Sequence, residues 1–318
     1  MGPFIQIARN TVRETLRQPI FFLVLLSALV LIGIYPLFTL FVFREQIKLV
    51  MDSAMATMLL FGWVVAVLSA SHTISREIHN GTVLLVLSKP VNRNAFLAGK
   101  IAGILTALTV FAFLASLATL VSIRVAKDQF NLDNTALAIY FGALALSCVA
   151  GGIGNYARHT SFPMTAVLAM LLLLPLATVM CYFLPVEEGV SRLYWPMLPA
   201  LVLVWFSVLA LGTLATALST RLDMVPNMIL CGIIFVLGLV SDFCFGQQAA
   251  HNWVAFLLYN TIPNWQLFWM ADALAAKRDI PWLYVAWAAV YVLSFIGGFL
   301  ALAALLFRNR EVGKQDLV

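Results

Sequence analysis

The stretch SREIHNGTVLLVLSKPVNR, residues 75–93, is the longest polar interruption between the apolar runs of the first third of the chain. Its charged residues are Arg76, Glu77, Lys89 and Arg93, which give it a net charge of +2. Inside it, residues 83–87 form an apolar island that is too short to cross a bilayer, since a spanning helix needs about 20 residues. An apolar island within a polar connection favours contact with a partner, and the side of the membrane on which it lies decides which partner is available.

The composition indicates a polytopic membrane protein. Of the 318 residues, 63% are hydrophobic and 10% are charged, whereas soluble domains have about 25% charged residues. So few charges cannot cover a soluble fold of this length. The four cysteines lie in apolar runs without CxxC or Cys/His spacing, so neither a disulfide framework nor a zinc site is predicted. We read the net charge of +5 as enrichment of Lys and Arg in cytoplasmic connections, and expect no nucleic acid partner.

Residues 1–18 are expected to form an amphipathic helix that lies in the membrane interface. Arg9, Arg13 and Arg17 form a basic stripe with a spacing of four, and apolar residues recur at helical spacing on another face. This pattern is typical of helices whose arginines point toward lipid phosphates. A solvated helical leader is the alternative reading. Pro19 is expected to end this helix.

Eight apolar segments are long enough to span a membrane, so we predict an all-α polytopic membrane protein with a single transmembrane domain over residues 1–318. The predicted spans are residues 20–43, 54–74, 95–123, 135–155, 160–184, 197–219, 225–246 and 281–307. The third span exceeds the thickness of the hydrocarbon core, so it must tilt or project. Gly99 and Gly103, four residues apart at its start, favour the close approach of another helix.

The distribution of Lys and Arg predicts that both termini are cytoplasmic. With the N-terminus inside, the inner positions are Arg9, Arg13, Arg17, Arg76, Lys89, Arg93, Lys100, Arg158, Arg221, Arg308, Arg310 and Lys314. The outer positions are Arg44, Lys48, Arg124, Lys127, Arg192, Lys277 and Arg278. The excess on the inner side follows the positive-inside rule. Residues 75–93 are therefore expected in the cytoplasm, and the chain in the plasma (inner) membrane.

The longest outer connection, residues 247–280, is rich in aromatic residues, among them Trp253, Trp265 and Trp269. Aromatic residues at this density are typical of the boundary between membrane and water. Short helices are expected near residues 254–259 and 265–274, with a break at residues 262–264 that contain Pro263. We predict that this segment forms a half-buried outer cap, since it is too short and too interrupted for a ninth span.

No catalytic cluster is recognisable, so the chain is not expected to be an enzyme. HExxH, GxSxG and paired intramembrane aspartates are missing from the sequence, and Gly99-Lys100 lacks the remainder of a Walker A motif. No cofactor or metal is predicted. Asp242, near the outer end of the seventh predicted span, is a candidate for a substrate pathway, although a hydrated interfacial carboxylate is the simpler reading. His72 is expected to be an interfacial histidine that is hydrogen-bonded locally.

The order of these elements resembles the permease subunits of ABC-2-type transporters, most closely the NosY-like permeases of the branch associated with multicopper-enzyme maturation. The resemblance rests on an N-terminal amphipathic helix, a pair of spans and a cytoplasmic pattern that leads into a long third span. In this pattern Glu77 is followed by Gly81-Thr82 and then by Pro90 and Arg93. It covers residues 1–125, and the family core has six spans where eight are counted here.

The resemblance implies that residues 75–93 are the coupling helix between the second and third spans, which binds a separate cytoplasmic ATPase. Its coupling residues would be Glu77, Gly81, Thr82, Val83, Leu84, Leu87, Pro90 and Arg93. Local chemistry favours the same shape, because Gly81 can stop one helix, Thr82 can cap the next, and Pro90 can end it. The apolar face would then insert into a groove of the partner. A reversal that touches lipid alone is the alternative.

These observations predict the membrane subunit of an ATP-driven exporter, with ATP bound by the partner subunit. A second permease copy, identical or related, and membrane lipid are the other expected partners. The alternative is a mechanotransmitter that transports nothing and acts on an extracytoplasmic partner through the outer cap. A third class, an intramembrane enzyme, is disfavoured because few ionisable residues lie within the predicted spans.

Overall fold

The computed structural model describes residues 2–39, 45–79, 93–126, 132–185, 193–248, 251–276 and 278–308. Across these ranges the chain is helical, apart from turns and an isolated β-bridge between Ala126 and Leu132. Within these described ranges, seven helices are long and apolar enough to cross a membrane, which supports a multi-pass membrane protein. The long helices are α2 (Pro19–Phe38), α3 (Gln46–Ala70), α6 (Arg93–Val125), α7 (Asn134–Arg158), α8 (Phe162–Phe183), α9 (Leu198–Ser219) and α13 (Trp282–Arg308).

The first helix, α1 (Pro3–Arg17), ends where the sequence predicts, because Gln18 is extended and Pro19 begins α2. Arg9, Arg13 and Arg17 are exposed, as expected for a basic stripe. The opposite face of α1 packs on α6: a Cβ atom at Gly103 would lie 2.5 Å from the Cβ of Thr11. The predicted close approach at Gly99 and Gly103 is therefore confirmed, since both glycines face α1. The position of α1 in a membrane interface stays a prediction.

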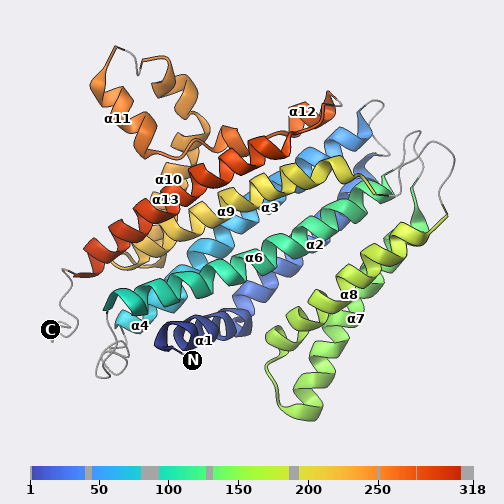
Figure 1. The fold of residues 1–318 in the computed structure, drawn as a ribbon. Helices are drawn as coiled ribbons and strands as arrows, with labels where there is room; N and C mark the ends of the chain where they lie inside the picture. Colours follow the sequence, from blue (N-terminus) through green and yellow to red (C-terminus); the bar gives the residue numbers. More distant parts are fainter. Residues whose placement is uncertain are drawn as a thin grey trace.

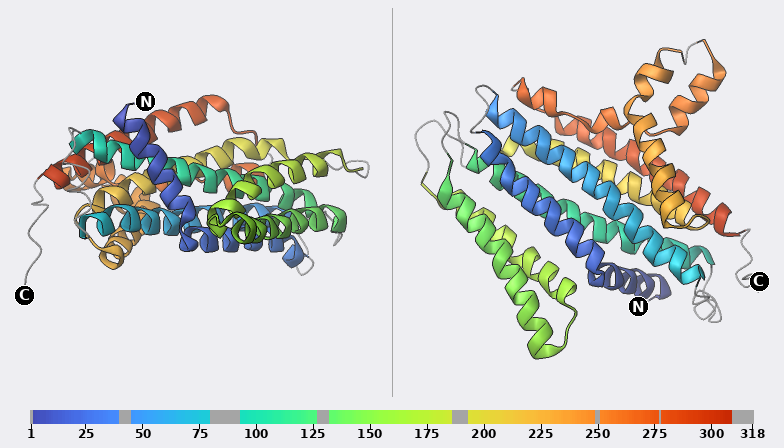
Figure 2. Two further views of the ribbon diagram at one scale, coloured as in Figure 1. Left: turned by 90° about the horizontal axis from the view of Figure 1, so that it is seen from below. Right: turned by 180° about the vertical axis from the view of Figure 1, so that it is seen from behind.

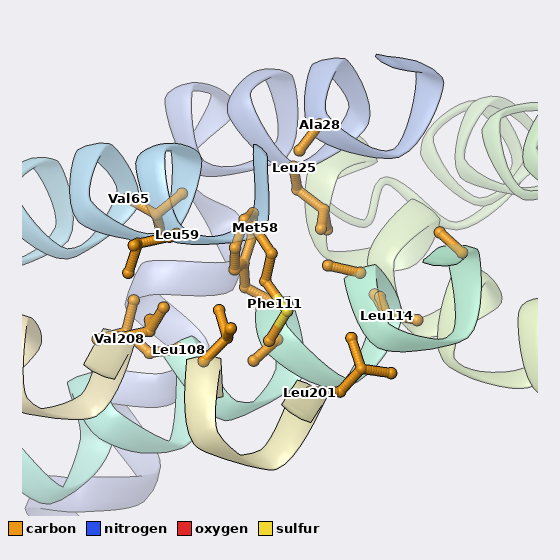
Figure 3. Close-up of a cluster of buried hydrophobic side chains, with 14 of the residues drawn as sticks. Leu25, Ala28, Met58, Leu59, Val65, Leu108, Phe111, Leu114, Leu201 and Val208 are labelled. Atoms are coloured by element: carbon orange, nitrogen blue, oxygen red, sulfur yellow. The ribbon is translucent and has the colours of Figure 1, made fainter. Parts of the chain in front are cut away.

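The centre of the bundle is formed by α2, α3, α6 and α9, while the α7–α8 hairpin lies beside it and splays away at one end (Figure 1). Side chains from the four central helices meet in one apolar cluster (Figure 3). The labelled members are Leu25, Ala28, Met58, Leu59, Val65, Leu108, Phe111, Leu114, Leu201 and Val208, all of which are buried. Glycines allow the closest crossings, since Gly62 lies against Val208 and Gly212 against Leu108.

Two ends of the bundle can be distinguished. At the first, which we call the α1 end, α1 packs against the start of α6, and the ring of Phe96 lies 6.3 Å from that of Phe307 at the end of α13. The second, which we call the α12 end, holds the start of α3 next to α12 (Ala271–Ala275), where Lys48 pairs with Asp272. Figures 1 and 2 show that the first and last helices both reach the α1 end.

The seventh predicted span, residues 225–246, is not one continuous helix. α10 (Met224–Leu239) has 16 residues and is about 24 Å long, shorter than the roughly 30 Å core. At the end of this helix Val240 leaves helical geometry, and the Leu239 carbonyl accepts a hydrogen bond from Nε2 of Gln266 at 2.7 Å. A π-helical turn, η4 (Asp242–Gly246), follows.

The segment after η4 contains short helices, as predicted, with the expected break at residues 262–264. These helices are α11 (Trp253–Thr261), η5 (Trp265–Phe268) and α12. η4 and α11 pack on each other and project away from the bundle (Figures 1 and 2). Trp265 differs from the expectation of an interfacial aromatic: it is 1% exposed and packs against Phe235 and Phe268. That side chain belongs to the core.

Candidate functional site

The structure describes part of the predicted coupling segment. Glu77 lies in α4 (Arg76–His79), a single turn that continues α3, and Arg93 begins α6. The predicted coupling residues Gly81, Thr82, Val83, Leu84, Leu87 and Pro90 lie outside the described residues. The described part shows how the start of residues 75–93 is attached to the bundle.

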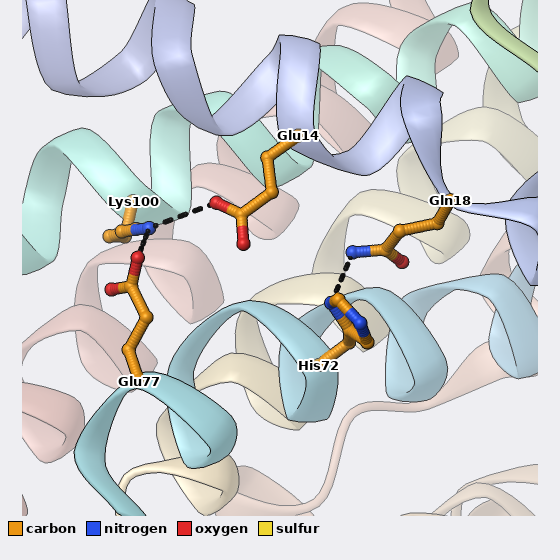
Figure 4. A network of polar contacts seen from close by, with 5 residues as sticks. All are labelled: Glu14, Gln18, His72, Glu77 and Lys100. Atoms are coloured by element: carbon orange, nitrogen blue, oxygen red, sulfur yellow. Dashed lines mark hydrogen bonds and ion pairs between the residues drawn. The ribbon is translucent and has the colours of Figure 1, made fainter. Parts of the chain in front are cut away.

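Lys100, on the second turn of α6, is the centre of a cluster of charges at the α1 end (Figure 4). Its Nζ atom lies 2.7 Å from Oε1 of Glu77 and 3.4 Å from Oε2 of Glu14. The two carboxylates come from α4 and α1, so the ammonium joins three helices. Nζ also lies 5.9 Å from the centre of the Phe96 ring, one turn earlier on α6, within the range of a cation–π contact.

Burial makes this cluster depend on its pairing. The Lys100 side chain is 7% exposed, and a buried ammonium is costly unless it is paired and hydrogen-bonded. Burial also raises the pKa of Glu77 above its ordinary value of 4.5, and the charge and hydrogen bond of Lys100 oppose that rise. Glu14 is the more exposed of the two carboxylates. The Glu77–Lys100 pair is therefore the closer and better shielded of the two contacts.

A second polar contact joins the start of α2 to the end of α3 (Figure 4). The side-chain amide of Gln18 lies 2.6 Å from Nδ1 of His72, and Nη1 of Arg76 lies 2.8 Å from Nε2. Both groups that face the ring, Nε2 of Gln18 and the guanidinium of Arg76, carry N–H donors, so the tautomer of His72 decides which of its two nitrogens accepts. His72 has a local partner, as expected, and also a partner on another helix.

The turn that carries these side chains is a π-helical segment, η2 (Ser71–Ser75), between α3 and α4. Its hydroxyls contact the start of α10: Ser75 donates to Oδ1 of Asp223 at 3.0 Å, and Nδ2 of Asn227 donates to Ser71 at 3.1 Å. Short π-helical turns inside α-helices are frequent at functional sites. Here η2 contacts the side chains of Gln18, Asp223 and Asn227, and α4, which follows it, contacts Lys100 of α6.

The sequence points to Glu77 but not to its partners. Glu14 stands next to the basic stripe of α1, which dominates the pattern there, and Lys100 contributes to the positive-inside distribution like any other inner charge. The signal that could have found them is a lysine at the start of a long apolar run, because ionisable residues there are usually paired. Asp242 is elsewhere: it is exposed on η4 and accepts a hydrogen bond from the Tyr259 hydroxyl at 3.3 Å.

Among the described residues, no group of three or more His, Cys, Asp or Glu side chains could hold a metal ion. The cluster at the α1 end instead consists of ion pairs and hydrogen bonds between helices. Such an arrangement can fix α1, α4 and α6 relative to one another.

The chain matches no protein-family model, and no curated protein is significantly similar to it.

Proposed function

We propose that this protein is the membrane subunit of an ATP-driven transporter of the ABC-2 type, and that it exports its substrate. Residues 75–93 would bind a separate cytoplasmic ATPase subunit, which carries the ATP. A second permease copy would complete the pathway in the plasma membrane. The observation that supports this proposal is the Glu14–Lys100–Glu77 cluster, which attaches the start of that segment to two other helices.

The cluster suits a coupling role because its partners are far apart in the sequence. Lys100 lies 23 residues from Glu77 and 86 from Glu14. A force applied to residues 75–93 would reach α4, and through Lys100 it would reach both α6 and α1. Because α4 continues α3, the same force would also tilt α3. The role proposed for Glu77 is accordingly to position the segment, whereas the apolar residues 83–87 would make the contact with the ATPase.

The test is co-purification of the ATPase from membranes with the tagged full-length chain. Leu84→Asp places a charge in the proposed apolar contact and should abolish association. Lys100→Met keeps the aliphatic stem but releases Glu77, and should reduce the recovered ATPase activity about tenfold, as loss of about 1.4 kcal/mol of binding would. The eluted ATPase is measured by ATP hydrolysis and identified by mass spectrometry.

Lys48→Met is the matched control. Lys48 also lies between two carboxylates, Glu45 at 3.8 Å and Asp272 at 3.7 Å, but at the α12 end. This variant should recover as much ATPase as the unmodified chain. Equal recovery with Leu84→Asp and with the unmodified chain would refute the assignment, and so would labelling of a cysteine at position 80 by an impermeant thiol reagent in intact cells.

A further inference from the structure

A cavity of about 570 Å³ opens between α3, α10 and the η5–α12 segment. Most of its lining is apolar and includes Leu59, Leu60, Phe235 and Trp269. Its polar members are Gln266 and Asp272. Sites for small molecules commonly measure about 300–1,000 Å³ and combine apolar walls with a few polar groups. This cavity fits that description in both respects.

The charged residues near the cavity at the α12 end include more carboxylates than cations. Asp272 is part of the lining, and Asp52 lies one turn before the lining residue Ala56 on the same face of α3. Glu45 and Lys48 complete the group, and Lys48 lies within 4 Å of Glu45 and Asp272 but is the single cation among the four. Their net charge is therefore negative. Oδ1 of Asp52 is buried and has no hydrogen-bond partner among the described residues.

A second cavity differs from the first in that its lining is uncharged. The groove of about 290 Å³ between α6 and α9 is lined by apolar residues and a few hydroxyls, and includes Phe113, Leu117 and Trp205. Its lining has no charged side chain, so it suits any lipid chain. The cavity beside Asp272 combines an apolar interior with carboxylates and an indole ring, which together favour an organic cation.

We propose that the cavity beside Asp272 binds an amphipathic organic cation, such as an ammonium or phosphonium with apolar substituents. The charged centre lies near Asp52, Asp272 and the Trp269 ring. The apolar part extends along α3 toward Leu60, a distance of about 12 Å from Asp52 at 1.5 Å per residue. That the cation is the exported substrate rests on the transport function proposed above, whereas its binding does not.

The experiment compares two probes of the same shape and opposite charge, tetraphenylphosphonium and tetraphenylborate. Equilibrium dialysis measures their binding to the purified full-length chain in maltoside detergent, with empty micelles subtracted. The phosphonium should bind and the borate should not. Asp52→Asn combined with Asp272→Asn should weaken phosphonium binding about tenfold, and Lys48→Met should strengthen it about threefold, as expected for partly exposed charges.

Two control variants separate binding from folding. Asp279→Asn removes an exposed carboxylate close in sequence to Asp272 that is not part of the lining, and should leave binding unchanged. Ala56→Phe fills the cavity and should abolish binding. A gain of affinity in Lys48→Met cannot come from misfolding. Equal binding of both ions, or no response to either change of charge, would overturn the proposal. Because no ATPase is present, either result leaves the test of ATPase association intact.

Discussion

α6 carries a buried cation near each of its ends, and the two are held differently. Lys100, at the α1 end, lies between carboxylates from two other helices. Arg124, at the opposite end of α6, pairs with Asp133 at 3.2 Å and donates to the Pro185 carbonyl at 3.4 Å. Both cations are buried, but Asp133 is 12% exposed, whereas Glu14 and Glu77 are 37% and 25% exposed.

The difference lies in what each pair connects. Asp133 immediately precedes α7, the next helix after α6, and caps it, since its side chain accepts from the backbone of Ala136. The β-bridge between Ala126 and Leu132 closes the same connection. The Arg124–Asp133 pair thus joins the end of α6 to the start of the next helix in the chain, whereas the Lys100–Glu14 pair joins helices that are far apart in the sequence. Of the two, the Lys100 cluster is suited to transmit motion and the Arg124 pair to resist it.

The largest effect is expected from Asp133→Asn. Asparagine can still cap α7 but leaves the Arg124 charge buried and uncompensated, which should lower the free energy of unfolding by about 3 kcal/mol. Thermal unfolding in detergent measures this change, with exposed Asp279→Asn as the control. The fraction of this variant that remains folded should recover as much ATPase as the unmodified chain. A loss of stability no larger than that of the control would mean that the Arg124 pair is not an anchor.

A smaller effect is expected from Lys100→Met. Glu14 and Glu77 are 37% and 25% exposed, so each can become hydrated, and the expected loss of stability is about 1 kcal/mol. The comparison therefore predicts opposite rankings: Asp133→Asn harms stability more, and Lys100→Met harms ATPase association more. Unfolding and co-purification measured on the same preparations check both rankings. If the same variant showed the larger loss in both measurements, the proposed difference between the two ends of α6 would be wrong.

The smallest effect concerns pH. Because the folded state raises the pKa of Glu77 above 4.5, the folded protein binds the proton more tightly than the unfolded chain does. The stabilisation is therefore fully present below pH 4.5 and is lost as the pH rises through the higher folded pKa. Melting temperatures measured across this window should fall with rising pH in the unmodified chain and fall less in Glu77→Gln. An identical pH profile for the two proteins would contradict this account.

Features that depend on local composition were predictable from the sequence. Apolar runs located seven of the eight predicted spans, and Pro19 and Pro263 marked real interruptions. Features that depend on contacts between distant residues were not predictable. The contact of Gln266 with the end of α10 and the burial of Trp265 against Gly238 both join segments that are distant in the sequence. The position of Lys100 indicates that it is paired, but the sequence does not identify Glu14 and Glu77 as its partners.

The π-helical turn η2, between α3 and α4, determines the direction in which the side chains of α4 point. A regular α-helix rotates by about 100° per residue, and a π-helical turn holds one residue more than an α-helical one. If the same residues formed a regular α-helix, Glu77 would be turned by about 100° away from Lys100. Deletion of one residue from Ser71–Ser75 would instead restore a regular helix and leave the direction of Glu77 nearly unchanged. The direction of Glu77 is thus set by the π-helical geometry of η2.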